Sequence, residues 1–143
     1  MLLKEIMATG TYVAVLPTDS TLALLRAWAD EQRIELDDHL HVTLLYSRKP
    51  VHVVPCTDEF VATGVSFDMF GDALVLKLNC PALDARHQEL MDQGGTHDFP
   101  TFNPHITIQA KSKEHLRSDR KIKDIPLPPG LILNREYSEP LDP

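Results

Sequence analysis

Two histidines, each followed two residues later by a threonine, are the side chains whose types and spacing could do chemistry. The first pair is His41 and Thr43 in LHVTLLY, and the second is His105 and Thr107 in PHITIQA. Phosphodiester cleavage needs a base on the attacking oxygen and an acid on the leaving oxygen. An imidazole titrates at about pH 6.5 and can serve in either role. The threonine hydroxyls could donate hydrogen bonds to the phosphate oxygens, which must hold negative charge during the attack.

Both motifs lie in segments typical of β-strands, where residues two apart point to the same face. His41 and Thr43 then share one face, and the aliphatic residues between and beside them occupy the other. The second strand repeats the pattern, with Gln109 predicted to follow Thr107 on the polar face and Ala110 to lie on the apolar face. Each strand therefore offers an imidazole and a hydroxyl on the side away from its aliphatic residues.

The elements that position the two motifs repeat in the same order. A strand over 11–16, a helix over 19–33 with Asp19 or Ser20 as its N-cap, and a motif strand over 40–46 form the first half. A strand over 73–79, a helix over 81–93 and a motif strand over 104–110 form the second. The histidines are 64 residues apart and the first strands begin 62 apart. This spacing indicates an internal duplication, which would bring the motif strands together across a shared cleft.

The remaining strands are predicted from local pattern. Residues 60–70 and 73–79 are predicted to form a hairpin across Gly71 and Asp72, and LILNREY (131–137) is predicted to form a last strand. The length of 143 residues fits one domain, so we expect residues 1–143 to form a single unit with two pseudo-symmetric lobes.

Composition excludes several classes of partner. A net charge of −7 argues against binding long nucleic acid, and no apolar run approaches the ~20 residues that cross a membrane. Cys56 and Cys80 are too few for a disulfide framework, and the first residues do not resemble a secretory signal. We therefore expect a cytoplasmic protein that works as a monomer.

The other histidines are interpreted as structural or peripheral. A single His-x-Thr is usually a half-buried polar pair, but two copies in equivalent places favour a site. His39 is assigned to the cleft rim, His87 to helix packing and His97 to a loop. No HxxxH pair occurs and no third ligand sits beside either motif, so we expect chemistry without a metal and without a cofactor.

The chain resembles the two-histidine phosphoesterases through its duplication, its motif spacing and the Pro-His start of the second motif. HVTLLYSRKP, PHITI and EYSEPLD further resemble the phage anti-CBASS cyclic-dinucleotide phosphodiesterases. The resemblance implies a duplicated, bilobal α+β fold, with two antiparallel-rich sheets forming a cleft and the helices packed outside.

The resemblance also implies an activity and its residues. His41 and His105 would be base and acid, Thr43 and Thr107 would hold phosphate oxygens, and the bases would contact Tyr12, Phe70 and Glu139. The implied reaction is metal-independent hydrolysis of 3′,3′-cyclic dinucleotides, such as cyclic GMP-AMP, or of cyclic trinucleotides. It would let a phage evade CBASS immunity in the cytoplasm of its bacterial host.

Several alternatives stay open at this point. Either histidine could be the base, and either a ribose 2′-hydroxyl or water could attack the phosphorus. An RNA-end 2′,3′-cyclic phosphodiesterase and a noncatalytic cyclic-nucleotide sponge are the alternative functions.

Overall fold

The computed structural model describes residues 10–97, 101–110 and 121–141, and these residues form six strands and two α-helices. The elements in order are β1 Thr11–Pro17, α2 Asp19–Gln32, β2 Val42–Ser47, β3 Phe60–Phe70, β4 Ala73–Asn79, α3 Pro81–Asp92, β5 His105–Gln109, the 3-10 turn η1 Ile122–Asp124, and β6 Leu131–Pro140. The predicted strands and helices are confirmed to within a few residues. The last strand extends three residues beyond its predicted end.

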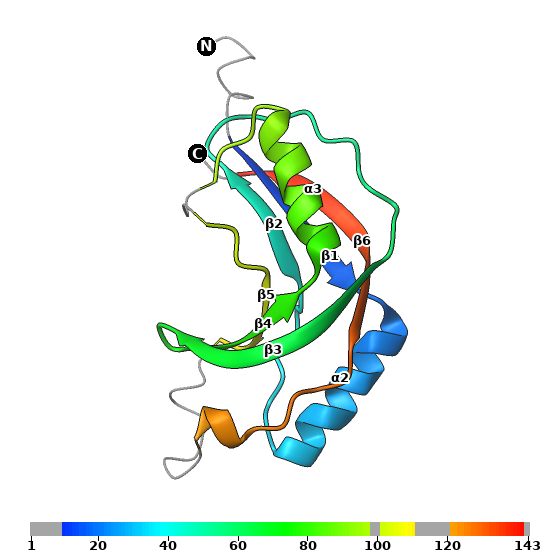
Figure 1. The fold of residues 1–143 in the computed structure, drawn as a ribbon, viewed down its shortest axis with the longest axis vertical. Coiled ribbons are helices and arrows are strands. Elements are labelled where there is room, and N and C mark those ends of the chain that lie inside the picture. The colour runs from blue at the N-terminus through cyan, green and yellow to red at the C-terminus, as the bar shows by residue number, and fades with distance from the viewer. Residues whose placement is uncertain (1–9, 98–100, 111–120, 142–143) are drawn as a thin grey trace.

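The strands pair antiparallel in one closed ring, in the order β1-β2-β5-β4-β3-β6 and back to β1. The α+β class is confirmed, whereas the implied pair of sheets is joined into a single hydrogen-bonded system. Two junctions close the ring: β2 meets β5 at Val42 and Ile106, and β3 meets β6 where Phe60–Ala62 pair with Leu131–Leu133. The second junction is made by the two long strands (Figure 1). The first residues of β3 lie beyond its pairing with β4, and they pair with the first residues of β6.

The ring has an order that an exchange of halves leaves unchanged. Replacing β1 by β4, β2 by β5 and β3 by β6, and the reverse, reproduces the same sequence of neighbours. The motif strands β2 and β5 exchange with each other under this operation and lie side by side. The histidine motifs are therefore neighbours because of the ring order.

Each motif strand carries a β-bulge at the third residue after its histidine. Val13 pairs with Leu45 and Ala14 with Thr43, so Leu44 is the extra residue in β2. Leu74 pairs with Gln109 and Val75 with Thr107, so Ile108 is the extra residue in β5. A bulge shifts the alternation of faces by one residue. The two motif strands thus carry the same irregularity at the same place.

The bulge in β5 corrects the predicted faces of two residues. Gln109 is buried and pairs with the fully buried Leu74, while Ala110 is exposed. The prediction that Gln109 shares the face of His105 was wrong, because strict alternation does not hold across an inserted residue.

Helix α2 begins at a cap one residue earlier than predicted. The hydroxyl of Thr18 accepts a hydrogen bond from the backbone N–H of Thr21, so Thr18 is the N-cap in place of Asp19 or Ser20. The helix ends at Gln32, and the C-cap residue Arg33 that follows has a left-handed backbone with φ 57°. Trp28 on its buried face stacks on Phe67 of β3 with ring centroids 5.7 Å apart.

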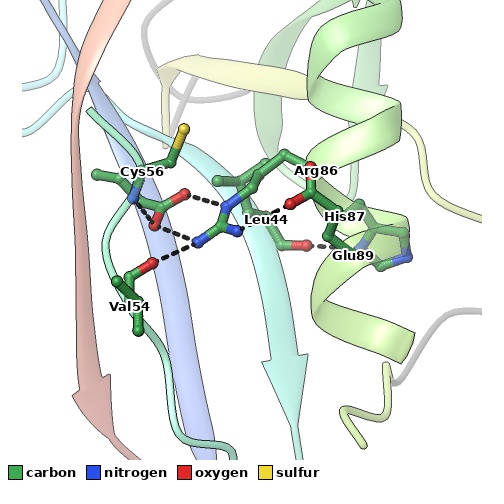
Figure 2. A network of polar contacts seen from close by, with 7 residues as sticks. Leu44, Val54, Cys56, Arg86, His87 and Glu89 are labelled. Carbon is green, nitrogen blue, oxygen red and sulfur yellow. Dashed lines mark hydrogen bonds and ion pairs between the residues drawn. The ribbon is translucent and has the colours of Figure 1, made fainter. Parts of the chain in front are cut away.

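Helix α3 lies over β2 and is tied to β6 by a buried ion pair (Figure 1). Arg86 donates to both carboxylate oxygens of Glu136, at 2.7 and 2.8 Å, and to the carbonyl of Val54. Glu136 also accepts from the backbone N–H of Cys56, and Figure 2 shows this network. The ion pair thus joins α3, β6 and the segment between β2 and β3.

Within the described residues, neither helix is long and apolar enough to cross a membrane.

Candidate active site

The register between β2 and β5 brings the two motifs into one site. Val42 and Ile106 are opposite each other and fully buried. Continuing the antiparallel ladder by one residue in each direction sets His41 opposite Thr107 and Thr43 opposite His105. Side chains at these positions point away from the buried pair. Each imidazole therefore has the hydroxyl of the other motif as its cross-strand neighbour, and the two imidazoles are diagonal to each other.

Both histidines are held by the same backbone hydrogen bond. Nδ1 of His41 lies 3.2 Å from the carbonyl oxygen of His39, and Nδ1 of His105 lies 2.8 Å from that of Asn103. A carbonyl oxygen only accepts, so Nδ1 carries the proton in both rings. Nε2 is then the nitrogen left to exchange a proton with a ligand. The bond to residue i−2 thus sets the tautomer and orientation of each ring.

The surroundings of His41 favour its neutral form. Burial, the largest cause, lowers the pKa of His41 below its ordinary 6.5, and the nearby charges of His39 and His105 act in the same direction. The bond to the His39 carbonyl opposes this shift. A neutral imidazole with a free Nε2 is a proton acceptor, so His41 is suited to act as a base.

Tyr12 on β1 is joined to the first motif through its hydroxyl. Its Oη lies 2.9 Å from Oγ1 of Thr43, and its ring centroid lies 6.3 Å from that of His41. Burial, with a contribution from Glu139, raises the pKa of Tyr12 to about 12, so its hydroxyl stays protonated at neutral pH. A hydroxyl that donates to Thr43 leaves the Thr43 proton available for a ligand oxygen.

A cavity of about 510 Å³ opens beside the motifs. Thr43 and His105 line it, and so do Tyr12 and Phe70, two of the three residues predicted to contact bases. The ring centroid of Phe70 lies 4.9 Å from that of His105 in an edge-to-face contact. The cavity thus adjoins one imidazole and one hydroxyl, one from each motif.

Glu139, the third predicted base contact, lies outside this cavity. It pairs with Tyr12 in the register of β6 and β1, but it lines a separate hollow with Gly10, Val51 and neighbouring residues. Burial raises the pKa of Tyr137, and the charge of Glu139 adds to that shift. The structure therefore places Glu139 near Tyr12 and Tyr137.

A family model described as "Anti-CBASS protein Acb1" matches residues 9–143 of the chain. The chain belongs to the Acb1 family. This result confirms the resemblance to phage anti-CBASS proteins, and membership of the wider two-histidine superfamily stays a prediction.

Three phage proteins, all named "Anti-CBASS protein Acb1", are similar to this Acb1-family chain over nearly its full length. The protein of Vibrio phage KVP40 is 36% identical, over 97% of the chain and 92% of the relative. The protein of Acinetobacter phage Ac42 is 33% identical, over 93% of the chain and 91% of the relative. The protein of Enterobacteria phage T4 is 33% identical, over 94% of the chain and 90% of the relative. The chain thus matches at least 90% of the length of each of these three relatives.

Five further described residues line the cavity of this Acb1-family chain and were not among the predicted site residues: Tyr46, His97, Thr101, Phe102 and Asn103. Strict alternation from Thr43 would turn Tyr46 away from the site. The bulge at Leu44 restores it to the face of Thr43. The signal in the sequence was the pair Leu44-Leu45, since two adjacent fully buried aliphatics do not fit a strand with one polar face.

Among the residues that the structure describes, no three His, Cys, Asp or Glu side chains are grouped so that they could hold a metal ion.

Proposed function

We propose that the chain is a phosphodiesterase that opens 3′,3′-cyclic dinucleotides and related cyclic oligonucleotides without a metal. The observation that carries the proposal is the pairing of Val42 with Ile106 in β2 and β5, because one further step along the ladder sets each motif histidine across from the other motif's threonine. Family membership supports it, because the relatives are named for acting against CBASS. Removal of the cyclic nucleotide signal in the bacterial cytoplasm would explain that action.

In the proposed mechanism His41 is the general base and His105 the general acid. Nε2 of His41 takes the proton from the attacking oxygen, which is a ribose 2′-hydroxyl or water. The new P–O bond forms as the opposite P–O bond breaks, and Nε2–H of His105 gives its proton to the leaving oxygen. The lowered pKa of His41 supports this direction, because it favours the neutral imidazole.

Thr43 and Thr107 would hold the non-bridging phosphate oxygens during attack. Each stands opposite one of the imidazoles, so their hydroxyls lie on the same face as the proton-transfer groups. The Tyr12 hydroxyl donates to Thr43 in this proposal, which aligns the Thr43 proton with the phosphate. Tyr12 therefore has a polar role in addition to any stacking on a base.

We also propose that residues 1–143 act as one domain of two pseudo-symmetric lobes. The bulges support a duplication, since Leu44 and Ile108 are each the third residue after a motif histidine and are 64 residues apart. The exchangeable order of the strand ring supports it as well.

Incubation with cyclic GMP-AMP in EDTA tests the proposed activity directly. We expect a linear dinucleotide as the first product, identified by mass spectrometry. A parallel incubation with an RNA oligomer ending in a 2′,3′-cyclic phosphate is expected to leave that RNA unchanged. Intact cyclic GMP-AMP recovered after denaturation of the protein would favour a sponge, and turnover of the RNA alone would favour an RNA-end enzyme.

The pH dependence of kcat/KM should reflect the environment of His41. We expect a bell-shaped profile whose acidic limb has its midpoint below pH 6.5, because the lowered pKa keeps His41 neutral until the pH falls below that value. His39→Gln removes one nearby charge and should move the acidic limb upward. The midpoint of the acidic limb should still lie below pH 6.5, because burial lowers the pKa of His41 more than the charge of His39 does. A rate that only rises with pH would contradict the role of an acid.

A further inference from the structure

Among the described residues, the wall of the cavity is aromatic and carries little charge. Tyr46 from β2, with His97 and Phe102 from the segment between α3 and β5, lines it, and we call these three residues the aromatic wall. None of the nine described lining residues is Asp, Glu, Lys or Arg. Such a lining suits a planar, neutral ring better than a second phosphate.

Polar groups in the cavity are arranged to orient a ring. Asn103 lines it, and among the described residues its side-chain amide has no hydrogen-bond partner. An amide offers donors beside an acceptor, which matches the edge of a nucleobase. The backbone carbonyl of Asn103 also holds His105, so Asn103 lies next to the proposed acid.

The aromatic wall is built on a buried histidine that the proposed mechanism does not use. Nδ1 of His87 on α3 donates to the carbonyl of Leu44, 2.6 Å away, and Figure 2 shows this bond. Leu44 is the bulged residue of β2, and a bulge leaves its extra residue out of the ladder. The His87 ring then stacks on Phe102, with centroids 4.2 Å apart and planes 6° from parallel. One side chain thus links the bulge behind Thr43 to the aromatic wall.

His97 completes the connection between the wall and β2. Its Nδ1 accepts a hydrogen bond from the backbone N–H of Tyr46 at 3.2 Å, and its ring packs edge-on against His87 at 4.8 Å. The preceding residue, Thr96, hydrogen-bonds through its backbone N–H to the hydroxyl of Ser47. Thr96 and His97 are therefore attached to the end of β2 just beyond the bulge.

We infer that the aromatic wall and Asn103 form a subsite for one nucleobase of the substrate, and that His87 is a positioning residue for Phe102. The inference rests on the proposed function and extends it. A phosphate held by Thr43 and His105 sits at the border of the cavity, so the base of the same nucleotide can enter it. Stacking on the wall would supply ~1–3 kcal/mol per base.

Phe102→Leu tests the subsite without changing a proposed catalytic group. With cyclic GMP-AMP we expect KM to rise between about 5-fold and 150-fold, as the stacking free energy implies, with little change in kcat. His52→Asn, at an exposed histidine outside the cavity, is the control and should leave both constants unchanged. Tyr46→Leu should raise KM in the same way. Unchanged KM in folded Phe102→Leu and Tyr46→Leu would overturn the subsite.

A double-mutant cycle tests the role of His87. Asparagine at this position can still donate to Leu44 but presents no ring for Phe102, so His87→Asn should raise KM. Adding Phe102→Leu to His87→Asn should cause little further rise, because both changes act through the same ring. If the KM increase of the double variant equals the product of the two single-variant increases, His87 does not act through Phe102.

Calorimetry separates failure of the subsite from failure of the proposed function. If the wild-type protein leaves cyclic GMP-AMP intact, the proposed activity is wrong, and its binding can still be titrated. Weaker binding by Phe102→Leu would then support the subsite on its own. Equal binding by folded Phe102→Leu and wild type would overturn it. Melting temperatures of all variants identify any that fail to fold.

Discussion

Replacement of His41 or His105 by alanine is expected to lower kcat for cyclic GMP-AMP by about 100- to 10,000-fold, the contribution typical of a positioned acid or base. Each variant loses one of the two proton transfers, and the remaining imidazole cannot act at both oxygens. Both side chains are partly exposed at the cleft, so the melting temperature should change little. Initial rates at saturating substrate, with circular dichroism for folding, measure both expectations.

His39→Ala is the matched control for this experiment. His39 lies two residues from His41, with ring centroids 5.2 Å apart, but it holds His41 through its backbone carbonyl. Alanine retains that carbonyl, so activity should stay within a few-fold of wild type. The double variant His41→Ala/His105→Ala should be little worse than either single variant, because groups that act as a unit are strongly non-additive. Full activity in either single variant would reject the assignment of the pair.

Glu136→Gln is expected to lower the free energy of unfolding by about 3–5 kcal/mol, the cost of leaving a buried charge without its partner. The side chains of Arg86 and Glu136 are 8% and 1% exposed, so water cannot replace the lost carboxylate. The Glu136 carboxylate raises the pKa of Arg86, and this contribution is lost in the variant. The guanidinium still remains charged there, because the ordinary pKa of arginine lies far above neutral pH. Urea denaturation followed by circular dichroism measures the change.

An exposed ion pair on the same strand provides the comparison. Arg135 lies 3.3 Å from Asp19, whose side chain is 91% exposed, and Asp19→Asn should cost less than about 1 kcal/mol. Replacing both members of the buried pair, as Arg86→Met with Glu136→Leu, should recover much of the loss because no unpaired charge remains. Equal effects at Asp19 and Glu136 would mean that burial does not set the contribution of the ion pair.

Much of the fold was predictable because local pattern and spacing carry it. The hairpin was predicted from Gly71, whose φ of 61° suits the two-residue turn between paired Phe70 and Ala73. Helix α3 was predicted from Pro81 in its first turn. The cap of α2 was misplaced by one residue because Thr18, Asp19 and Ser20 are all good capping residues.

The wall residues were less predictable because they depend on long-range pairing. Tyr46 faces the cavity only because β1 pairs with β2 on both sides of an inserted Leu44. Phe102 stacks on His87, a residue on α3 that sequence reasoning assigned to helix packing. Neither contact leaves a periodic signal in the segment where the residue lies.

By itself, the sequence determined the chemical groups of the candidate site and their local presentation. Two His-x-Thr pairs on strands place an imidazole and a hydroxyl on one face, and this follows from the two-residue period of a strand. Only the tertiary structure decided which groups meet. The pairing of Val42 with Ile106 across β2 and β5 sets each histidine across from the other motif's threonine, and the bulge in β2 turns Tyr46 toward the cavity. The physical reason is that face and register are properties of paired strands, and pairing joins residues far apart in the chain.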